Sequence, residues 1–481
     1  MSPLAGKDAG AGRNARAALV FGLALAAGLG LRLAMLAKVF QVQGDSLIYG
    51  SIAKNLLQHG VYAYTGETGA LHTTLIRLPG YPLILAACFR LFGMENYASV
   101  VYIQIALDLV ACLLLADFAG RIAPQALKRV AAVATLWLAA LCPFTAEYSA
   151  QPMAESLTIF ALVLALWAMA RFRDEPGWKY ALWFTLAVTL AALLRPDGAL
   201  AAVAFAPALG MGLPFGAIAK GKLAKMAAVC VFLALLPFAA WTGRNWRVFH
   251  VVQPLAPRTA MDPGELTNPG WERWVKTWSL DFASTYNVYW HVPDEPLDVN
   301  DMPARAFDSA AQKAEVERIA AAYEDNDEKL SPALDAQFAQ LAEQRIREHP
   351  LRYYAWLPLG RLADMLLHPR TENMNIDVDW WVYEHHPNET VFSWAYGGLN
   401  ALYLALGLAG LCLRPRLWLP LAAYVLMRCL LLMTMSGPED RYTLEFFPML
   451  FAWGGVAIAA WLVRWKVKRP LILKFVQGTS R

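Results

Sequence analysis

The chain has 481 residues, of which 58% are hydrophobic and 17% carry a charge, and its mean hydropathy is +0.36. Soluble domains contain roughly 25% charged residues, so this composition excludes an ordinary water-soluble protein and indicates a chain that crosses a membrane several times. The formal net charge of +4 favours no particular class of partner. We expect membrane lipids, and no nucleic acid, around the chain.

Apolar runs long enough to cross about 30 Å of hydrocarbon occur repeatedly along the sequence. They predict an all-α polytopic membrane protein with about ten transmembrane helices. An alternative for the first run is a cleaved signal sequence, but the run is long and no small-x-small pattern closes it. The runs fall near 17–37, 98–118, 127–143, 153–171, 179–194, 197–215, 223–242, 393–413, 416–436 and 444–464.

Lysine and arginine gather in every second connection between these runs. By the positive-inside rule these basic connections lie in the cytoplasm, together with both termini. The remaining connections are then extracytoplasmic. The basic residues are Lys7, Arg13, Arg16, Arg121, Lys128, Arg129, Arg171, Arg173, Lys179, Lys220, Lys222, Lys225, Arg414, Arg416, Arg464, Lys466, Lys468 and Arg469.

The lengths of the connections divide the chain into three regions. Residues 1–242 form a predicted transmembrane module that includes a large first outer loop, 38–97. Residues 243–392 form an extracytoplasmic region, because about 150 residues far exceed an ordinary connection. Residues 393–481 hold the last transmembrane helices and a basic cytoplasmic tail.

The extracytoplasmic region is predicted to be largely helical. Residues 303–324 are rich in alanine and charge, and 331–349 place apolar side chains at near-helical spacing. Residues 351–357 are aromatic and apolar with basic flanks, which is typical of a helix lying in the membrane interface.

The first outer loop carries an acidic residue directly before an amphipathic pattern. Residues 46–59 predict a helix with one apolar face, which Gly60 can end, and Asp45 stands at its N-terminus. The alternative is that Asp45 or Ser46 simply caps this helix. Capping and catalysis are compatible, since a cap also fixes the carboxylate. A second interfacial helix is expected over 82–92.

Further polar residues are predicted to converge on the same outer face. Arginines there can bind a phosphate through two donors, and carboxylates can act as general bases or hold a cation. The alternative for each arginine alone is that it only reaches to the interface from an apolar segment. The residues are Glu147, Glu155, Arg195, Asp197, Arg244, Asn245, Glu439, Asp440, Arg441 and Tyr442.

Two ionisable residues, Asp108 and Arg428, fall well inside predicted spans. Ionisable residues within a membrane are candidates for function, and a buried structural pair is the equal alternative.

Seven stretches, taken in order, resemble the GT-C class of integral-membrane glycosyltransferases. This superfamily includes the protein O-mannosyltransferases and the lipid A aminoarabinose transferases, and the chain is most similar to family 39-like members. The resemblance covers most of the chain. The stretches are Gly44–Gly60, Arg77–Leu83, Ala154–Leu157, Leu194–Asp197, Trp241–Asn245, Arg347–Tyr354, and Glu439–Tyr442 followed by Pro448.

The resemblance implies an enzyme that moves a sugar from a polyprenyl-phosphate donor to a lipid, glycan or protein acceptor. The reaction is expected on the extracytoplasmic face of a bacterial inner membrane, with inversion and with Asp45 as general base. The expected donor-phosphate residues are Arg244, Arg195, Arg441 and Arg77. Glu155, Tyr81, Asn245 and Tyr442 are expected to contact the substrates in other ways.

The sequence departs from the family at three points. Gly44 precedes Asp45 where many relatives carry a second acidic residue, so no metal ligand set is predicted and a divalent cation stays an open question. Arg77 is followed by Leu78 and Pro79, where many relatives have a basic residue directly before Pro-Pro. The large outer region lies between spans, so the acceptor does not carry over from the better-known relatives.

Two other functions stay open from the sequence. An O-antigen-type polymerase or ligase would also bind a lipid phosphate, but its chemistry would lie in a late loop and Asp45 would be dispensable. A lipid-linked sugar transporter or flippase would place charged or broken segments at the membrane midplane, whereas most polar residues here are predicted at one face.

Overall fold

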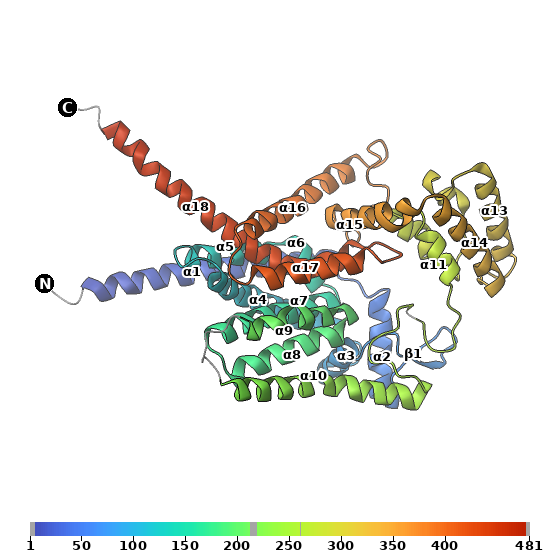
Figure 1. The fold of residues 1–481 in the computed structure, drawn as a ribbon, viewed down its shortest axis with the longest axis horizontal. Coiled ribbons are helices and arrows are strands. Elements are labelled where there is room, and N and C mark those ends of the chain that lie inside the picture. Colours follow the sequence, from blue (N-terminus) through green and yellow to red (C-terminus); the bar gives the residue numbers. More distant parts are fainter. Residues whose placement is uncertain (1–4, 212–218, 260, 478–481) are drawn as a thin grey trace. The chain divides into compact units, whose positions relative to one another are not determined.

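The computed structural model describes residues 5–211, 219–259 and 261–477. Helices dominate this part of the chain, and one pair of short strands accompanies them (Figure 1). The chain forms two compact units. The first comprises Met1–Pro257, Leu402–Val425 and Leu444–Arg481, and the second comprises Arg258–Ala401 and Leu426–Thr443. The three sequence regions predicted above remain predictions.

The first unit is a bundle of long apolar helices with a small outer loop structure. The loop contains an antiparallel hairpin that pairs Ala63 with Thr73 and Thr65 with Leu71, which the sequence analysis did not predict. The elements are α1 (Ala5–Val39), α2 (Asp45–His59), β1 (Ala63–Thr65), β2 (Leu71–Thr73), α3 (Gly80–Phe92), α4 (Tyr97–Ile122), α5 (Lys128–Ala140), α6 (Pro143–Ser149), α7 (Ala154–Asp174), α8 (Trp178–Leu194), η1 (Pro196–Gly198), α9 (Ala199–Gly210), α10 (Lys220–Phe249) and α18 (Phe447–Gln477).

Six helices in the described residues are long and apolar enough to cross a membrane. They are Ala18–Val39, Tyr97–Ile122, Ala154–Asp174, Lys220–Phe249, Pro387–Cys412 and Asp440–Trp465. A seventh span is possible if α5 and α6, which meet at a 55° bend, cross together. The prediction of a helical, multi-pass membrane protein is therefore confirmed, while ten spans remain a prediction.

The other three apolar runs form helices that are shorter than a full span. α8 has 17 residues, α17 (Trp418–Leu432) has 15, and α9 has 12. The predicted run 197–215 extends beyond Gly210 into 212–218, which lie outside the described residues.

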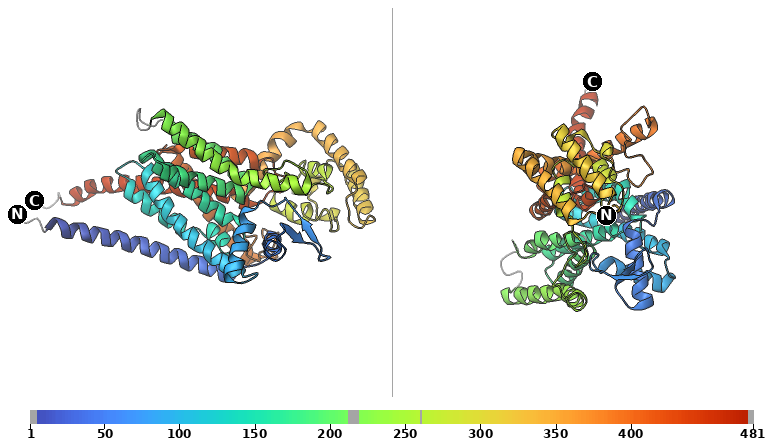
Figure 2. Two further views of the ribbon diagram at one scale, coloured as in Figure 1. Left: turned by 90° about the horizontal axis from the view of Figure 1, so that it is seen from below. Right: turned by 90° about the vertical axis from the view of Figure 1, so that its right-hand side faces the viewer.

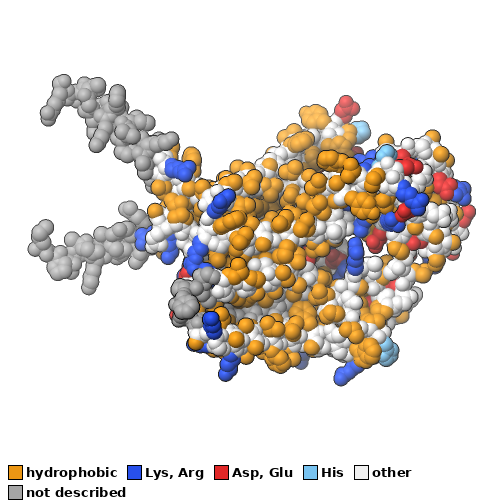
Figure 3. All heavy atoms as spheres, in the orientation of Figure 1, with side chains coloured by type: hydrophobic (Ala, Val, Ile, Leu, Met, Phe, Trp, Pro, Cys, Tyr) orange, Lys and Arg blue, Asp and Glu red, His pale blue; other side chains and the backbone are white. Residues whose placement is uncertain are grey.

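The surface of the first unit suits hydrocarbon. Apolar side chains cover much of its visible face (Figure 3), and α10 exposes a continuous series of them, Val231, Phe232, Leu233, Leu235 and Leu236. Only 6% of the apolar window of α10 is buried within the protein. The outer ends of α1 and α18 extend from the same end of this unit (Figure 2).

One buried ion pair joins three of these helices. Arg32 of α1 contacts Asp108 of α4, with 2.5 Å between Nη2 and Oδ2, and both side chains are almost fully buried. The same guanidinium donates to the carbonyl oxygens of Gly28 (2.9 Å) and Ala140 (2.8 Å), the latter at the end of α5. This geometry supports the structural interpretation of Asp108.

The second unit has a core of aromatic side chains. Trp271 and Trp274 of α11 (Pro269–Val275) pack on Phe338 of α14 (Pro332–Glu348), with ring centroids 5.0 Å apart in each pair. Asp335 accepts hydrogen bonds from the backbone N–H groups of Gly270 and Trp271, which fixes the start of α11. The remaining elements are α12 (Phe282–Ser284), η2 (Thr285–Tyr289), η3 (Val299–Asp301), η4 (Ala304–Ala306), α13 (Ala310–Glu324), η5 (Arg352–Trp356) and α15 (Leu357–Leu367).

α16 (Pro387–Cys412), α17 and η6 (Asp440–Phe446) contribute residues to both units. Within the second unit, Arg428 of α17 is fully buried and donates from Nη2 to the carbonyl oxygen of Tyr442, 2.6 Å away.

Replacing Asp108 by asparagine should destabilise the protein strongly. The change leaves the Arg32 guanidinium buried without its carboxylate, and breaking a buried pair costs about 3–5 kcal/mol. We expect the free energy of unfolding, measured by denaturant titration in detergent, to fall by that amount. The double variant Arg32→Leu, Asp108→Leu should recover much of the loss, because it removes both charges.

The control for this experiment is Glu95→Gln. It breaks the pair between Glu95 and Lys54, which is 3.1 Å long and substantially exposed. Exposed pairs contribute less than about 1 kcal/mol. Equal losses in Asp108→Asn and Glu95→Gln would contradict a structural role for the buried pair.

Candidate active site in the first outer loop

The helix α2 positions the acidic residue singled out by the sequence. Gly44 precedes it with φ +53° and ψ −124°, a backbone conformation that favours glycine. Gly60 ends the helix with φ +69°, as predicted. Ser46 donates from Oγ to the carbonyl oxygen of Pro152, 3.1 Å away, which ties α2 to the segment before α7. Asp45 is thus the first residue of a helix whose start is tied to the segment before α7.

Asp45 forms an ion pair with Arg77. The distance from Oδ1 to Nη2 is 2.5 Å, and the two side chains are 24% and 23% exposed. Gly44, rather than Asp45, stands at the N-cap position. Capping therefore does not account for Asp45, whose carboxylate is held by an arginine and remains accessible to solvent.

Tyr49 lies one helical turn after Asp45. Its ring packs edge to face on Tyr81 with centroids 5.0 Å apart, and the Arg77 guanidinium lies 5.8 Å from the ring centroid. Burial, and then the Asp45 carboxylate, raise the pKa of Tyr49 to about 12. Tyr49 is therefore a neutral phenol at physiological pH. Sequence reasoning missed it, although its i+4 spacing from Asp45 could have drawn attention to it.

Tyr81, a predicted substrate residue, is fully buried at the start of α3. Its hydroxyl donates to Oε1 of Gln104, 2.8 Å away. Gly80 beside it packs against the end of α8, where a Cβ would lie 2.5 Å from the carbonyl oxygen of Leu193. This close approach brings α3 and the turn that contains Arg195 together.

Arg195 is surrounded by carboxylates. Its Nη1 lies 2.8 Å from Glu155, and its Nε lies 3.3 Å from both Asp197 and Glu445. Glu155 and Glu445 are buried. The charges of Glu155 and Arg195 both act on Tyr49. Tyr49 therefore lies within the electrostatic reach of this cluster and of the Asp45–Arg77 pair.

The turn that carries Arg195 depends on a glycine. At Gly198, a Cβ would lie 2.2 Å from the carbonyl oxygen of Ala191. The chain can therefore fold back on the end of α8 and bring Asp197 next to Arg195.

Arg244 binds backbone carbonyl groups of the first outer loop. Its Nη1 donates to the Thr74 oxygen (2.7 Å) and its Nη2 to the Tyr62 oxygen (2.9 Å). The guanidinium also lies 5.3 Å from the ring centroid of Tyr62 and 5.1 Å from that of Trp241. Asn245, which is buried, donates to the Gln253 carbonyl at 2.8 Å. Arg244 thus joins α10 to the segment that contains the hairpin.

The remaining predicted residues, Arg441 and Tyr442, belong to the second unit. Arg441 Nε lies 2.6 Å from Glu439, and the Tyr442 hydroxyl donates to the same carboxylate. Whether these residues act together with Asp45 stays a prediction.

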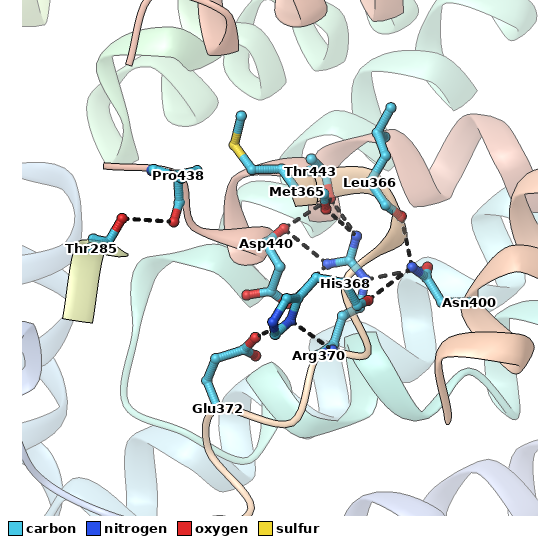
Figure 4. A network of polar contacts seen from close by, with 10 residues as sticks. All are labelled: Thr285, Met365, Leu366, His368, Arg370, Glu372, Asn400, Pro438, Asp440 and Thr443. Atoms are coloured by element: carbon cyan, nitrogen blue, oxygen red, sulfur yellow. Dashed lines mark hydrogen bonds and ion pairs between the residues drawn. The ribbon is translucent and has the colours of Figure 1, made fainter. Parts of the chain in front are cut away.

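Asp440 and Thr443, which lie in the same helix η6 as Arg441 and Tyr442, take part in a buried network (Figure 4). Arg370 Nη1 lies 3.3 Å from Asp440, and Arg370 also donates to Asn400 and Thr443. His368 Nδ1 lies 2.6 Å from Glu372. Burial disfavours a charged imidazole, yet the Glu372 carboxylate raises the pKa of His368 to about 9. The sequence analysis did not single out His368, Arg370 or Glu372.

Groups of histidine and carboxylate close enough to share a metal ion occur in the second unit. They are Asp379, His385 and His386; Asp377, His386 and Glu389; and Asp308, Glu348 and His349. In the residues that the structure describes, Asp45 belongs to none of these groups.

Comparison with known proteins bears on the fold. Residues 76–241 match the family model of the dolichyl-phosphate-mannose-protein mannosyltransferases, which confirms the resemblance to the GT-C class in this part of the chain. An Archaeoglobus fulgidus oligosaccharyltransferase, tethered to an acceptor peptide, has a similar structure. It shares 13% sequence identity with this chain at a TM-score of 0.50. The match covers 95% of this chain and 50% of the oligosaccharyltransferase chain. The chain has the GT-C fold.

Two further GT-C structures are similar at lower scores. The complex of the archaeal oligosaccharyltransferase AglB from Archaeoglobus fulgidus with an inhibitory peptide and a dolichol-phosphate shares 12% identity. Its TM-score is 0.49, and the match covers 98% of this chain and 53% of that chain. ArnT from Cupriavidus metallidurans in the apo state shares 15% identity at a TM-score of 0.37. That match covers 91% of this chain and 76% of ArnT.

The chain therefore spans about half the length of the oligosaccharyltransferase structures that it resembles. No curated protein matches it in sequence.

Arg244→Lys should loosen the outer loop. Lysine cannot reproduce the planar fork that reaches two carbonyl groups, and one charge-assisted hydrogen bond contributes about 1.5–3 kcal/mol. We expect faster amide hydrogen exchange over residues 61–76, by roughly tenfold or more. Arg247→Lys, an exposed change one turn further along α10, is the matched control. Equal exchange in the two variants would contradict an anchoring role for Arg244.

Proposed function

We propose that the protein is a glycosyltransferase that moves a sugar from a polyprenyl-phosphate donor to an acceptor on the extracytoplasmic face of a bacterial inner membrane. The observation that carries this proposal is the partly exposed Asp45–Arg77 pair at the start of α2. A second arginine, Arg195, has its charge within reach of the same tyrosine, Tyr49. A carboxylate paired with one arginine, with the charge of a second acting on the neighbouring tyrosine, suits proton abstraction next to a leaving phosphate.

In the proposed reaction Asp45 is the general base. An acceptor hydroxyl attacks the anomeric carbon while its proton passes to the Asp45 carboxylate. The new carbon–oxygen bond forms as the bond from the anomeric carbon to the phosphate oxygen breaks, and the polyprenyl phosphate leaves with the electron pair. A single displacement of this kind inverts the anomeric configuration.

Arg77, which pairs with Asp45, and Arg195, whose charge acts on Tyr49, are the first proposed phosphate-binding residues in this mechanism. Guanidinium groups that already face carboxylates are oriented before the donor arrives, which lowers the cost of ordering them. Tyr49, as a neutral phenol, would donate a hydrogen bond to a sugar or phosphate oxygen. Glu155 and Tyr81 would hold Arg195 and the start of α3 in place.

Arg244 and Asn245 are proposed to act on the donor through the loop that they hold. The backbone contacts of Arg244 fix the segment at whose end Arg77 stands. Direct phosphate binding by Arg244 or Arg441 also remains part of the proposal, together with substrate contacts by Tyr442.

The donor class is supported by the matched family. The description of that family names a dolichyl-phosphate sugar, and the matched region 76–241 includes Arg77, Tyr81, Glu155 and Arg195. The acceptor stays open among lipid, glycan and protein, because the chain spans only half the length of the peptide-bound relative.

The proposed topology has ten spans with both termini in the cytoplasm. The common direction of the outer ends of α1 and α18 within the first unit supports this arrangement (Figure 2). The first outer loop, with Asp45, would then face the extracytoplasmic side, where nucleotide sugars are absent and lipid-linked donors are used.

Cysteine labelling in intact cells tests this topology. In a variant without the native cysteines, Ala321→Cys should react with a membrane-impermeant maleimide, because residues 243–392 are extracytoplasmic in the proposal. Lys222→Cys should react only after the cells are opened. Both residues are exposed in the structure, so accessibility is matched. Reversed labelling would overturn the placement of the active site.

Asp45→Asn should abolish sugar transfer. Loss of a general base commonly reduces turnover about 10²–10⁴-fold, and asparagine keeps the size of the side chain. The assay measures release of polyprenyl phosphate, and transfer of radiolabel, from a panel of polyprenyl-phosphate sugars incubated with purified protein and membrane extract. Glu95→Gln, which removes an exposed carboxylate elsewhere in the first outer loop, should retain wild-type turnover.

The same assay distinguishes the alternatives. Near-wild-type turnover in Asp45→Asn would refute the assignment of the base and favour a polymerase or ligase with its chemistry in a later loop. Translocation of the sugar lipid across vesicles without bond cleavage would identify a transporter instead.

A further inference from the structure

A histidine-rich segment of the second unit lies outside the proposed active site. It connects α15 to α16 and carries Asp377, Asp379, His385, His386 and, in the first turn of α16, Glu389. Backbone hydrogen bonds fold it tightly, since the N–H groups of His385 and His386 both donate to the carbonyl oxygen of Val382. Thr390 donates from Oγ1 to the carbonyl of Trp380, which ties the segment to α16.

The imidazole of His386 has a carboxylate on each side. Its Nδ1 lies 3.2 Å from Asp377 and 3.9 Å from Glu389, and its Nε2 lies 3.4 Å from Asp379. The ring is 22% exposed, whereas the Asp379 side chain is 51% exposed. The Nε2 side of the ring therefore opens toward solvent.

These contacts are compatible with a metal-binding tautomer of His386. A histidine that binds a metal commonly donates its other ring N–H to a carboxylate, which fixes the ring and makes the free nitrogen a better ligand. Asp377 is placed to accept from Nδ1–H. The backbone N–H of Asp377 in turn donates to Glu389, 3.0 Å away, which orients the second carboxylate on the same side. With the proton on Nδ1, Nε2 would present its lone pair on the side of Asp379, 3.4 Å away.

Asp379, His385 and His386 can each direct one ligand atom to a common point. These atoms all lie within 4.8 Å of one another. Ligand atoms of a tetrahedral zinc ion at 2.0–2.1 Å are roughly 3.4 Å apart, so small side-chain rotations would close the site. Two imidazoles and a carboxylate suit zinc and similar transition metals, while magnesium and calcium prefer oxygen ligands.

We infer that Asp379, His385 and His386 bind a divalent transition-metal ion, with zinc the expected ion, and that Asp377 and Glu389 orient His386 from the second coordination sphere. A water molecule would complete the coordination. The ion would fasten the connection between α15 and α16 to the first turn of α16. The proposed ligands include none of the residues assigned to the chemistry at Asp45.

The third group of candidate ligands, Asp308, Glu348 and His349, provides an internal comparison. There Arg352 already binds Asp308 through two contacts of 2.6 and 2.7 Å. A fixed guanidinium next to the carboxylate opposes a cation. We therefore expect no metal ion at Asp308, Glu348 and His349.

Metal analysis of the full-length protein in detergent tests the inference. The protein is purified through a tag that requires no metal, stripped with a chelator, and titrated with Zn²⁺ and separately with Co²⁺. Bound zinc is counted by elemental analysis after dialysis, and the visible absorption of Co²⁺ reports nitrogen and oxygen ligands. Size-exclusion profiles establish that each variant folds.

We expect one zinc ion per chain in the wild type. His385→Ala, His386→Ala and Asp379→Asn should each lose it, and Asp377→Asn should weaken binding about 10–100-fold, as loss of an orienting partner commonly does. His349→Ala should bind as the wild type does. A wild type that binds no zinc at micromolar concentrations, or ligand variants that bind as tightly as the wild type, would overturn the inference. So would equal losses in His349→Ala and His386→Ala.

Asp45→Asn should keep the zinc ion, since Asp45 is not among the proposed ligands or their orienting partners. Failure of the zinc prediction therefore leaves the proposed transferase unaffected, and the reverse also holds.

Discussion

A charge removed from water must be neutralised or bound by polar groups, and this constraint explains much of the internal architecture. Arg32 in the first unit and Arg345 in the second are both fully buried. The Arg32 guanidinium contacts one carboxylate and donates to two carbonyl oxygens. The Arg345 guanidinium donates to the carbonyl oxygens of Ala306 and Arg305 and to the hydroxyl of Thr277. Leaving such a group unpaired costs several kcal/mol. Each arginine therefore fixes the segments that provide its partners.

In the first outer loop, charged side chains are paired but only partly buried. This difference from the buried arginines suits the chemistry that we propose there. Asp45 and Arg77 are paired but about a quarter exposed, so both side chains stay accessible from solvent, as the proposed function requires. Arg195 meets three carboxylates, which fix the position of its guanidinium. Gly80 and Gly198 allow the backbone of α3 and of the turn after α8 to pack closely against the end of α8.

Much of the fold could be predicted because apolar length and charge distribution are local properties of the sequence. Helices occur at all ten apolar runs, and α2 and α3 lie within two residues of their expected starts. The strands could not be foreseen, since three-residue strands depend on pairing rather than on their own composition. The break between α5 and α6 was also missed, although Pro143 at the start of α6 is consistent with it.

The candidate site was predictable in its residue types and not in its pairings. Asp45 and Arg77 were both selected, but their contact joins positions 32 residues apart and no periodicity reveals it. Arg244 was selected as an arginine near the interface, and only tertiary structure shows that it reaches the carbonyls of Tyr62 and Thr74. Tyr49 was overlooked because a tyrosine on a half-apolar helix looks like ordinary packing.

The attachment of the hairpin to α10 has a consequence for how the protein can change over evolutionary time. Arg244 binds the main chain on either side of β1 and β2, and main-chain oxygen atoms are present whatever side chain a position carries. Substitutions between residues 63 and 73 therefore leave both bonds available. The hairpin can therefore change its side chains while its attachment to α10 stays the same.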